Sequence, residues 1–257
     1  MSSMSLSSTA TCAVQPEMAA AAQTAGLQPI PVMGEVPEMR HLQALRASLS
    51  AARVATYETA TVGAGLPVER AVELYAWNAQ VSGVFLIPLH ICEVVVRNAV
   101  SEALTLRYGT EWPWSVGLLR SLPTCAGPRY DARTDLSRTR EKHRTTGGVV
   151  AELKNVFWEK QFTKRNDQRL WEPYLFQLFP NLNPSGSVKL HRRRIACDLE
   201  TVRHLRNRIA HHEPIFNRNL HGDFQKICEL VELRCSDTAS MMLQAHRVME
   251  ALKARPF

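Results

Sequence analysis

The last third of the chain places an arginine, an amide and two histidines close together on one amphipathic stretch. The stretch reads LRNRIAHHEP from residue 205 to residue 214. At about 100° per residue, the apolar side chains of a helix here form one stripe, and Arg206 falls inside that stripe. Asn207 and His211 are four residues apart and share the neighbouring polar face. Pro214 disfavours helical geometry at the residue before it, so we expect the helix to end just after His212.

The apolar stripe itself is a helical pattern of six residues. It consists of Ile195, Leu199, Val202, Leu205, Ile209 and Ala210.

These residue types match the needs of RNA cleavage. The 2′-hydroxyl of RNA is the nucleophile, so a protein has only to move protons and to stabilise charge on the phosphoryl oxygens. Histidine titrates near neutral pH, and the arginine fork matches phosphate oxygens. We therefore expect His211 to act as acid or base, Arg206 to clamp the phosphate and Asn207 to position either partner.

No metal or other cofactor enters this prediction. His211 and His212 project about 100° apart on a helix, so both do not easily reach one ion. The sequence also contains no H-E-x-x-H motif, carboxylate cluster or Cys/His knuckle.

Two blocks of sequence resemble a known family. Arg206-Asn207 followed by His211 resembles the motif of HEPN ribonucleases, and RNRIAHHEPIF resembles the Abi-like (abortive infection) branch of that superfamily. The second block consists of YAWN at 75–78, EVVVRNA at 93–99 and RYGTEWPW at 107–114. It is similar to the amino-terminal half of Abi-like proteins, so the resemblance covers residues 38 to 250.

The resemblance implies an all-α, HEPN-type helical bundle with additional helices, over residues 37–257. It implies an endoribonuclease that acts in phage defence or as a toxin, with an antitoxin or a small RNA as a further partner. It also implies a homodimer in which two motifs face each other. Glu93, in the second block, is expected to approach Arg206 from another helix, with Arg97 and His212 as further supporting residues.

Three alternatives remain open on the residues alone. In the first, Arg206 pairs with a buried carboxylate such as Glu93, and His211 caps carbonyl groups at the helix end, where the dipole favours positive charge. In the second, His212 is a hydrogen-bonded structural histidine and not a catalytic one. In the third, the whole protein is a non-catalytic RNA-binding module or a structural helical protein.

Charge favours a polyanionic partner. The chain carries a formal net charge of +7, and the residues before Arg40 hold three acidic side chains but no lysine or arginine. The basic excess therefore lies in the part that contains the motif. We expect five arginines around the motif to contact the RNA backbone, namely Arg192, Arg193, Arg194, Arg203 and Arg208.

Composition indicates a globular, cytoplasmic protein with a disordered leader. With 257 residues and 45% hydrophobic content, the chain can bury a large core. Residues 1–36 are of low complexity and lack the basic and apolar regions of a signal peptide. The uncharged run between Glu73 and Glu93 contains several polar residues, which favours a buried helix over a membrane span. The six cysteines form no C-x-x-C pair, which fits a reducing compartment, and Cys92, Cys197 and Cys228 are expected to pack as small hydrophobes.

The pattern along the chain predicts helices and no strands. One helix begins at His41 and is broken at Gly63–Pro67, and the next begins at Pro67 and is either kinked at Pro88 or divided near Ser82-Gly83. The later predictions are helical spacing over 149–162, a turn at 180–186, a helix over 187–212 and a helix over 220–252 interrupted near 236–237. Residues 129–144 are expected to form an exposed, mobile basic loop, and Trp112 and Trp114 to anchor packing.

Overall fold

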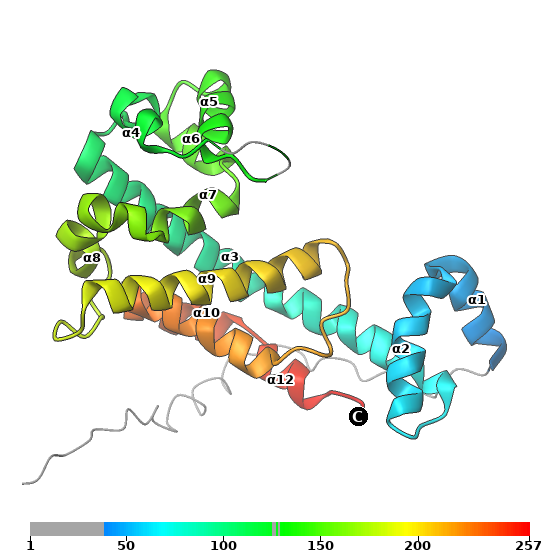
Figure 1. Ribbon diagram of the computed structural model, residues 1–257. Coiled ribbons are helices and arrows are strands. Elements are labelled where there is room, and N and C mark those ends of the chain that lie inside the picture. The colour runs from blue at the N-terminus through cyan, green and yellow to red at the C-terminus, as the bar shows by residue number, and fades with distance from the viewer. Residues whose placement is uncertain (1–38, 125–126, 128) are drawn as a thin grey trace, which may run out of the picture.

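The computed structural model describes residues 39–124, 127 and 129–257, and these residues form an all-α fold without strands. The leader predicted over 1–36 lies outside them. The α-helices, shown in Figure 1, are α1 (Met39–Leu49), α2 (Ala51–Gly63), α3 (Ala71–Tyr108), α4 (Val116–Ser121), α5 (Ala132–Lys142), α6 (Thr146–Glu152), α7 (Asn155–Glu159), α8 (Glu172–Leu178), α9 (Val188–Ala210), α10 (Leu220–Arg234), α11 (Ser236–Ala245) and α12 (Val248–Lys253).

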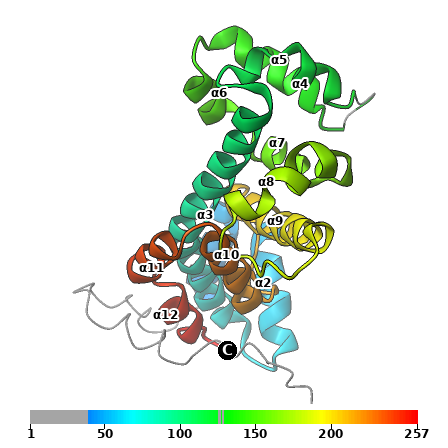
Figure 2. The same ribbon diagram turned by 90° about the vertical axis from the view of Figure 1, so that its left-hand side faces the viewer.

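Helix α3 is the axis of the fold. It runs without a break through Pro88, so the two-helix alternative at Ser82-Gly83 is wrong. Along its length it packs against α2, α7, α8, α10, α11 and α12. Figure 1 shows α1 and α2 at its amino-terminal end, and Figures 1 and 2 show α4, α5 and α6 around its carboxyl-terminal end.

By length and composition, the segment Val68–Tyr108 is apolar enough to cross a membrane. Its most apolar window has a mean hydropathy of 1.8, and 33% of that window is buried. The buried side of α3 includes Val81, Phe85 and Val96, which belong to the central core. The helix therefore contributes a core face, as the sequence predicts, and also leaves apolar side chains such as Leu86 exposed.

One continuous cluster of buried side chains extends from Tyr57 on α2 to Leu252 on α12. Trp112 is fully buried and stacks against Phe157 at 6.4 Å between ring centroids. Trp114 packs on the same core. Both tryptophans are packing anchors, as predicted.

The structure corrects the prediction for residues 129–144. Most of this segment is helix α5, which begins after Asp131, whose carboxylate accepts a hydrogen bond from the Thr134 amide. Ala132, Leu136 and Thr139 are buried on one face, so the segment is anchored to the core. The mobile-loop prediction missed this short apolar period because basic residues surround it.

Several helix boundaries also differ from prediction. Helices α1 and α2 are separated at Ser50, which has φ 71° and caps α2. The segment 149–162 is divided between α6, α7 and a 3-10 turn, and the segment 220–252 between α10, α11 and α12. The break near 236–237 and the turn at 180–186 are confirmed. Cys92 is buried, but Cys197 is exposed, contrary to prediction.

Candidate functional site

Helix α9 carries the motif at its last turn. Its apolar stripe is buried as predicted at five positions: Ile195, Leu199, Val202, Leu205 and Ile209. Ala210 is exposed, because the stripe ends where the helix leaves the core. Arg206 lies at the edge of the stripe, with 43% of its side chain exposed. The helix ends at Ala210, with His211 as its C-cap, close to the predicted end at His212.

The end of α9 is a Schellman motif. The Glu213 amide donates to the Arg208 carbonyl at 2.8 Å, and the His212 amide donates to the Ile209 carbonyl at 3.0 Å. His212 occupies the left-handed position, with φ 55°, where glycine is usual. The two histidines therefore differ in backbone conformation, and both are exposed.

The loop after the motif is fixed to α3 by one buried amide. The Asn78 side-chain oxygen accepts hydrogen bonds from the amides of Ile215 at 2.7 Å and Phe216 at 3.2 Å. Asn78 belongs to the YAWN block, so this part of the second sequence block acts by holding the motif loop. Backbone amides buried in this way need such a partner.

Two arginines hold the same loop from outside. Arg53 on α2 donates to the His212 carbonyl. Arg208 donates to the Pro214 carbonyl at 2.9 Å and lies 3.7 Å from the Glu213 carboxylate. The position of His211 is therefore set by contacts from α2, α3 and α9 together.

The motif side chains themselves are weakly engaged. The Arg206 Nε lies 3.7 Å from the Glu93 carboxylate, and this pair forms no hydrogen bond. The side chains of Asn207 and His211 have no hydrogen bond among the described residues. The alternative in which His211 caps carbonyl groups is therefore not the arrangement seen, and Glu93, with 30% of its side chain exposed, is not a buried partner.

The structure brings Glu93 to Arg206, as the resemblance implies, across a narrow cleft between α3, α7 and α9. Cys92, Asn155, Glu159 and Arg206 also line this cleft. Burial raises the pKa of the Cys92 thiol to about 12, so this thiol stays protonated at neutral pH. Arg97 lies one turn beyond Glu93, and its buried Nε has no hydrogen-bond partner in the described part of the chain.

Sequence reasoning missed His90. This exposed histidine lies on α3 in register with Leu86 and Glu93, four residues after the first and three before the second. Glu93 reaches Arg206, and Leu86 and His212 line one groove, so His90 stands between two features of the site. The helical spacing from Glu93 was the signal in the sequence.

A groove of about 480 Å³ opens beside the last turn of α9. Among its lining residues are Tyr57, Tyr75, Asn78, Ser82, Gly83 and His212, and we call it the tyrosine groove. Tyr57 comes from α2 and the next four residues from α3. The groove therefore depends on the packing of α2 and α3 against the motif loop.

Four of the five arginines predicted to contact RNA are held in ion pairs. Arg192 is 12% exposed and binds both carboxylate oxygens of Asp167, at 2.8 and 3.3 Å. Arg203 binds the buried Glu159, and Arg208 holds the motif loop. Arg194 pairs with Glu229 and Asp198. RNA contact by these four arginines stays a prediction, and Arg192 is the least exposed of them, with its donors on Asp167.

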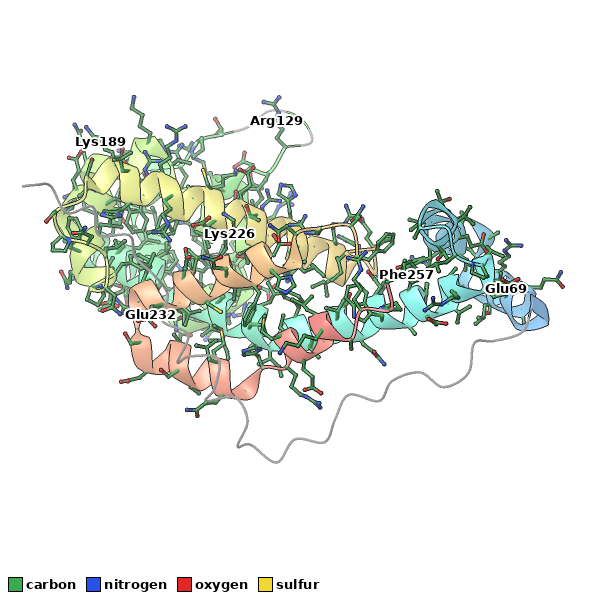
Figure 3. All side chains as sticks on the ribbon, turned by 90° about the horizontal axis from the view of Figure 1, so that it is seen from below. Glu69, Arg129, Lys189, Lys226, Glu232 and Phe257 are labelled. Carbon is green, nitrogen blue, oxygen red and sulfur yellow. The ribbon has the colours of Figure 1, made fainter. Side chains whose placement is uncertain are left out.

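Arg193 is the exception. It is exposed and has no partner among the residues that the structure describes. Lys189, one turn earlier on α9, is also exposed. Figure 3 shows Lys189 and Arg129 pointing to the same side of the molecule. RNA contact thus remains a prediction that rests on Arg193 and on exposed cations of this face.

In the described ranges, no three His, Cys, Asp or Glu side chains gather closely enough to form a metal site. No protein-family model matches the chain, and neither a curated protein nor a solved structure is significantly similar to it.

Proposed function

We propose that this protein is a metal-independent endoribonuclease of the Abi-like HEPN type. The observation that carries the proposal is the contrast on α9. Arg203 and Arg208 are bound by hydrogen bonds, whereas Arg206, Asn207 and His211 present their polar groups without one in the described structure. A motif that only tied helices together would use these groups internally. Groups of these types that are at least partly exposed and make no hydrogen bond fit an anionic substrate.

The proposed reaction is an in-line transfer at one phosphate of RNA. A base removes the proton of the 2′-hydroxyl, the 2′-oxygen forms a bond to phosphorus, and the bond to the 5′-oxygen breaks. An acid gives a proton to the departing 5′-oxygen. The products are a 2′,3′-cyclic phosphate and a 5′-hydroxyl. His211 performs one of the two proton transfers, and Arg206 stabilises the charge on the phosphoryl oxygens.

Glu93 has a positioning role in this proposal. At 3.7 Å it attracts the Arg206 guanidinium without occupying its donors by a hydrogen bond. A phosphate forms stronger, bidentate contacts with an arginine and so replaces this loose pair when RNA binds. Asn207, on the same turn, orients the phosphate or His211.

The second proton transfer comes, in this proposal, from a second copy of the chain. One chain has one Arg206–His211 motif, while in-line cleavage benefits from an acid and a base on opposite sides of phosphorus. Two copies related by a two-fold axis supply both. Leu86 and Ile87 on α3 are 55% and 42% exposed and provide apolar surface on the helix that carries Glu93.

We further propose that the activity serves phage defence or a toxin system in the cytoplasm. This step rests on the resemblance of RNRIAHHEPIF and of the second block to Abi-like proteins. An antitoxin or a small RNA is the partner that such an arrangement requires.

The test is incubation of the purified protein with total RNA in excess EDTA, followed by analysis of the RNA ends. We expect cleavage that leaves 2′,3′-cyclic phosphate and 5′-hydroxyl ends, and no cleavage at a position that carries a 2′-deoxy sugar. His211→Ala should lower the rate by about 10²–10⁴-fold. Cleavage that requires added Mg²⁺ would contradict the mechanism.

Motif variants also separate this proposal from its rivals. Loss of cleavage with retained RNA binding in His211→Ala supports the enzyme. If the wild-type protein binds RNA and never cuts it, the protein is an RNA-binding module. Unfolding of the variant would point to a structural motif instead.

A further inference from the structure

The tyrosine groove contains aromatic walls beside the motif loop. The rings of Tyr57 and Tyr75 lie 4.9 Å apart between centroids and are tilted by 58°. On the α3 side, Gly83 leaves the groove open, because a Cβ built there meets no atom within 4 Å. The volume of about 480 Å³ lies in the range of small-ligand sites. The groove thus has the shape and the walls to accept a planar ring.

The floor of the groove holds polar donors that lack acceptors. Asn78 is 6% exposed, and while its oxygen binds two loop amides, its NH₂ group has no hydrogen bond in the described residues. Tyr57 is 1% exposed, and its hydroxyl has no partner there either. Burial raises the pKa of Tyr57 to about 12, so the hydroxyl keeps its proton at neutral pH. Neither atom is among the buried, unpartnered side-chain atoms of the described residues, so both donors open onto the groove and can meet an acceptor placed there.

Two arginines lie on the motif side of the groove. Arg53 donates to the His212 carbonyl, and Arg208 donates to the Pro214 carbonyl, so both guanidinium groups lie at the motif loop. His212 itself lines the groove, and His211 precedes it. An anionic group attached to the ring would therefore be attracted to the motif side of the groove.

We propose that the tyrosine groove binds one nucleobase of an RNA strand, next to the phosphate that Arg206 and His211 act on. The inference rests on the proposed function. A base stacks on Tyr75, and its carbonyl oxygens or ring nitrogens accept hydrogen bonds from the Asn78 amide and the Tyr57 hydroxyl. The groove thereby selects which base stands beside the cleaved bond.

The polar floor favours a nucleobase over a second copy of the chain. An apolar side chain from a partner, such as an exposed leucine, would cover the donors of Asn78 and Tyr57 and leave them unsatisfied. A base satisfies them along its edge while its faces meet the aromatic walls. Contact with a second copy is the alternative, and the experiment below distinguishes it by molecular mass.

The experiment fills the groove without disturbing the fold. Gly83→Leu adds a side chain into open space at a helical position, where replacement of glycine favours the helix. Gly147→Leu is the matched control, since Gly147 also lies on a helix with open space around it, on α6. Both changes are made in a His211→Ala background, so that RNA is bound and not cut.

The probes are fluorescein-labelled hexaribonucleotides of A, C and U and an abasic hexamer with the same sugar-phosphate backbone. We expect Gly83→Leu to weaken binding of the base-containing hexamers by about tenfold, the size of one stacking contact, and to leave the abasic hexamer unchanged. Gly147→Leu should change neither. Asn78→Asp keeps the acceptor for the loop and removes the amide donor, so the order of affinity among A, C and U should change.

Three results would overturn the inference. They are equal weakening for the abasic hexamer, no weakening for any hexamer, and a change of molecular mass by light scattering in Gly83→Leu, which would assign the groove to a second copy. The proposed nuclease can fail separately. If the protein binds RNA in a base-dependent way but never cuts it, the groove proposal stands and the nuclease proposal fails. If the protein cuts RNA and Gly83→Leu leaves cleavage unaffected, the nuclease proposal stands and the groove proposal fails.

Discussion

At the scale of single residues, the two histidines at the end of α9 differ in backbone conformation. His211 has φ −94°, whereas His212 has φ 55°. The left-handed conformation costs a residue with a Cβ about 1–2 kcal/mol, and glycine avoids that cost. The backbone freedom of glycine in the unfolded chain offsets about 0.5–1 kcal/mol of this gain.

We therefore expect His212→Gly to raise the free energy of unfolding by about 0.5–1 kcal/mol. His211→Gly should lower it, because His211 gains nothing from access to positive φ. Urea unfolding of both variants measures the difference. A lower stability of His212→Gly would show that the imidazole makes a stabilising contact, as in the structural-histidine alternative.

At the scale of elements, two neighbouring arginines of α9 differ in their surroundings. Arg192 is largely buried and binds Asp167, whose side chain is 5% exposed, while Arg193 points to solvent. Removal of one partner of a buried ion pair leaves an uncompensated charge. Removal of an exposed side chain rarely changes stability.

We expect Arg192→Ala to lower the free energy of unfolding by about 3–5 kcal/mol. Arg193→Ala should stay within about 0.5 kcal/mol of the wild type. In RNA binding measured across salt concentrations with the His211→Ala protein, Arg193→Ala should reduce the salt slope by about one. An unchanged slope would remove Arg193 from the RNA surface.

The loop between α9 and α10 depends on one side chain of α3. Asn78→Ala removes the acceptor for the amides of Ile215 and Phe216, each of which then costs about 1–3 kcal/mol if it stays buried. We expect a loss of roughly 2–4 kcal/mol, and faster hydrogen exchange at these two amides. Asn78→Asp keeps an acceptor and should restore most of the stability. Wild-type exchange rates in Asn78→Ala would contradict the anchoring role.

At the scale of the whole molecule, the proposed mechanism uses two proton-transfer groups, and one motif per chain therefore predicts a dimer. The proposed dimer should have about twice the chain mass of 28.9 kDa by light scattering. Excess His211→Ala subunits mixed with wild-type subunits should lower activity more steeply than dilution does, because mixed dimers keep only one complete motif.

A fully active monomer, or a strictly linear loss of activity on mixing, would exclude the composite site. The second proton-transfer group would then come from the same chain. His90 on α3 and His212 in the motif loop are the two candidates, and His90→Ala separates them. Loss of activity in this variant alone would assign the role to His90.

The all-α fold and the buried stripe of α9 follow from the sequence. Five apolar residues at helical spacing form one face of a helix, and this spacing predicts that the face is buried without knowledge of its packing partner. The end of the helix is also local, since Pro214 and the turn before it stop the helix. The same reasoning missed helix α5. Its buried residues, Ala132, Leu136 and Thr139, form only a weak helical pattern because charged residues surround them.

The tasks of the charged and polar side chains were decided only by the tertiary structure. Sequence treats Arg192 and Arg193 alike, but Asp167, 25 residues away from Arg192, binds one and not the other. Asn78 reads as a polar residue in an apolar helix, and the fold alone places it under a loop 137 positions later. The physical reason is that burial patterns arise from neighbours along one helix, whereas ion pairs and hydrogen bonds require a partner whose position depends on how separate helices pack.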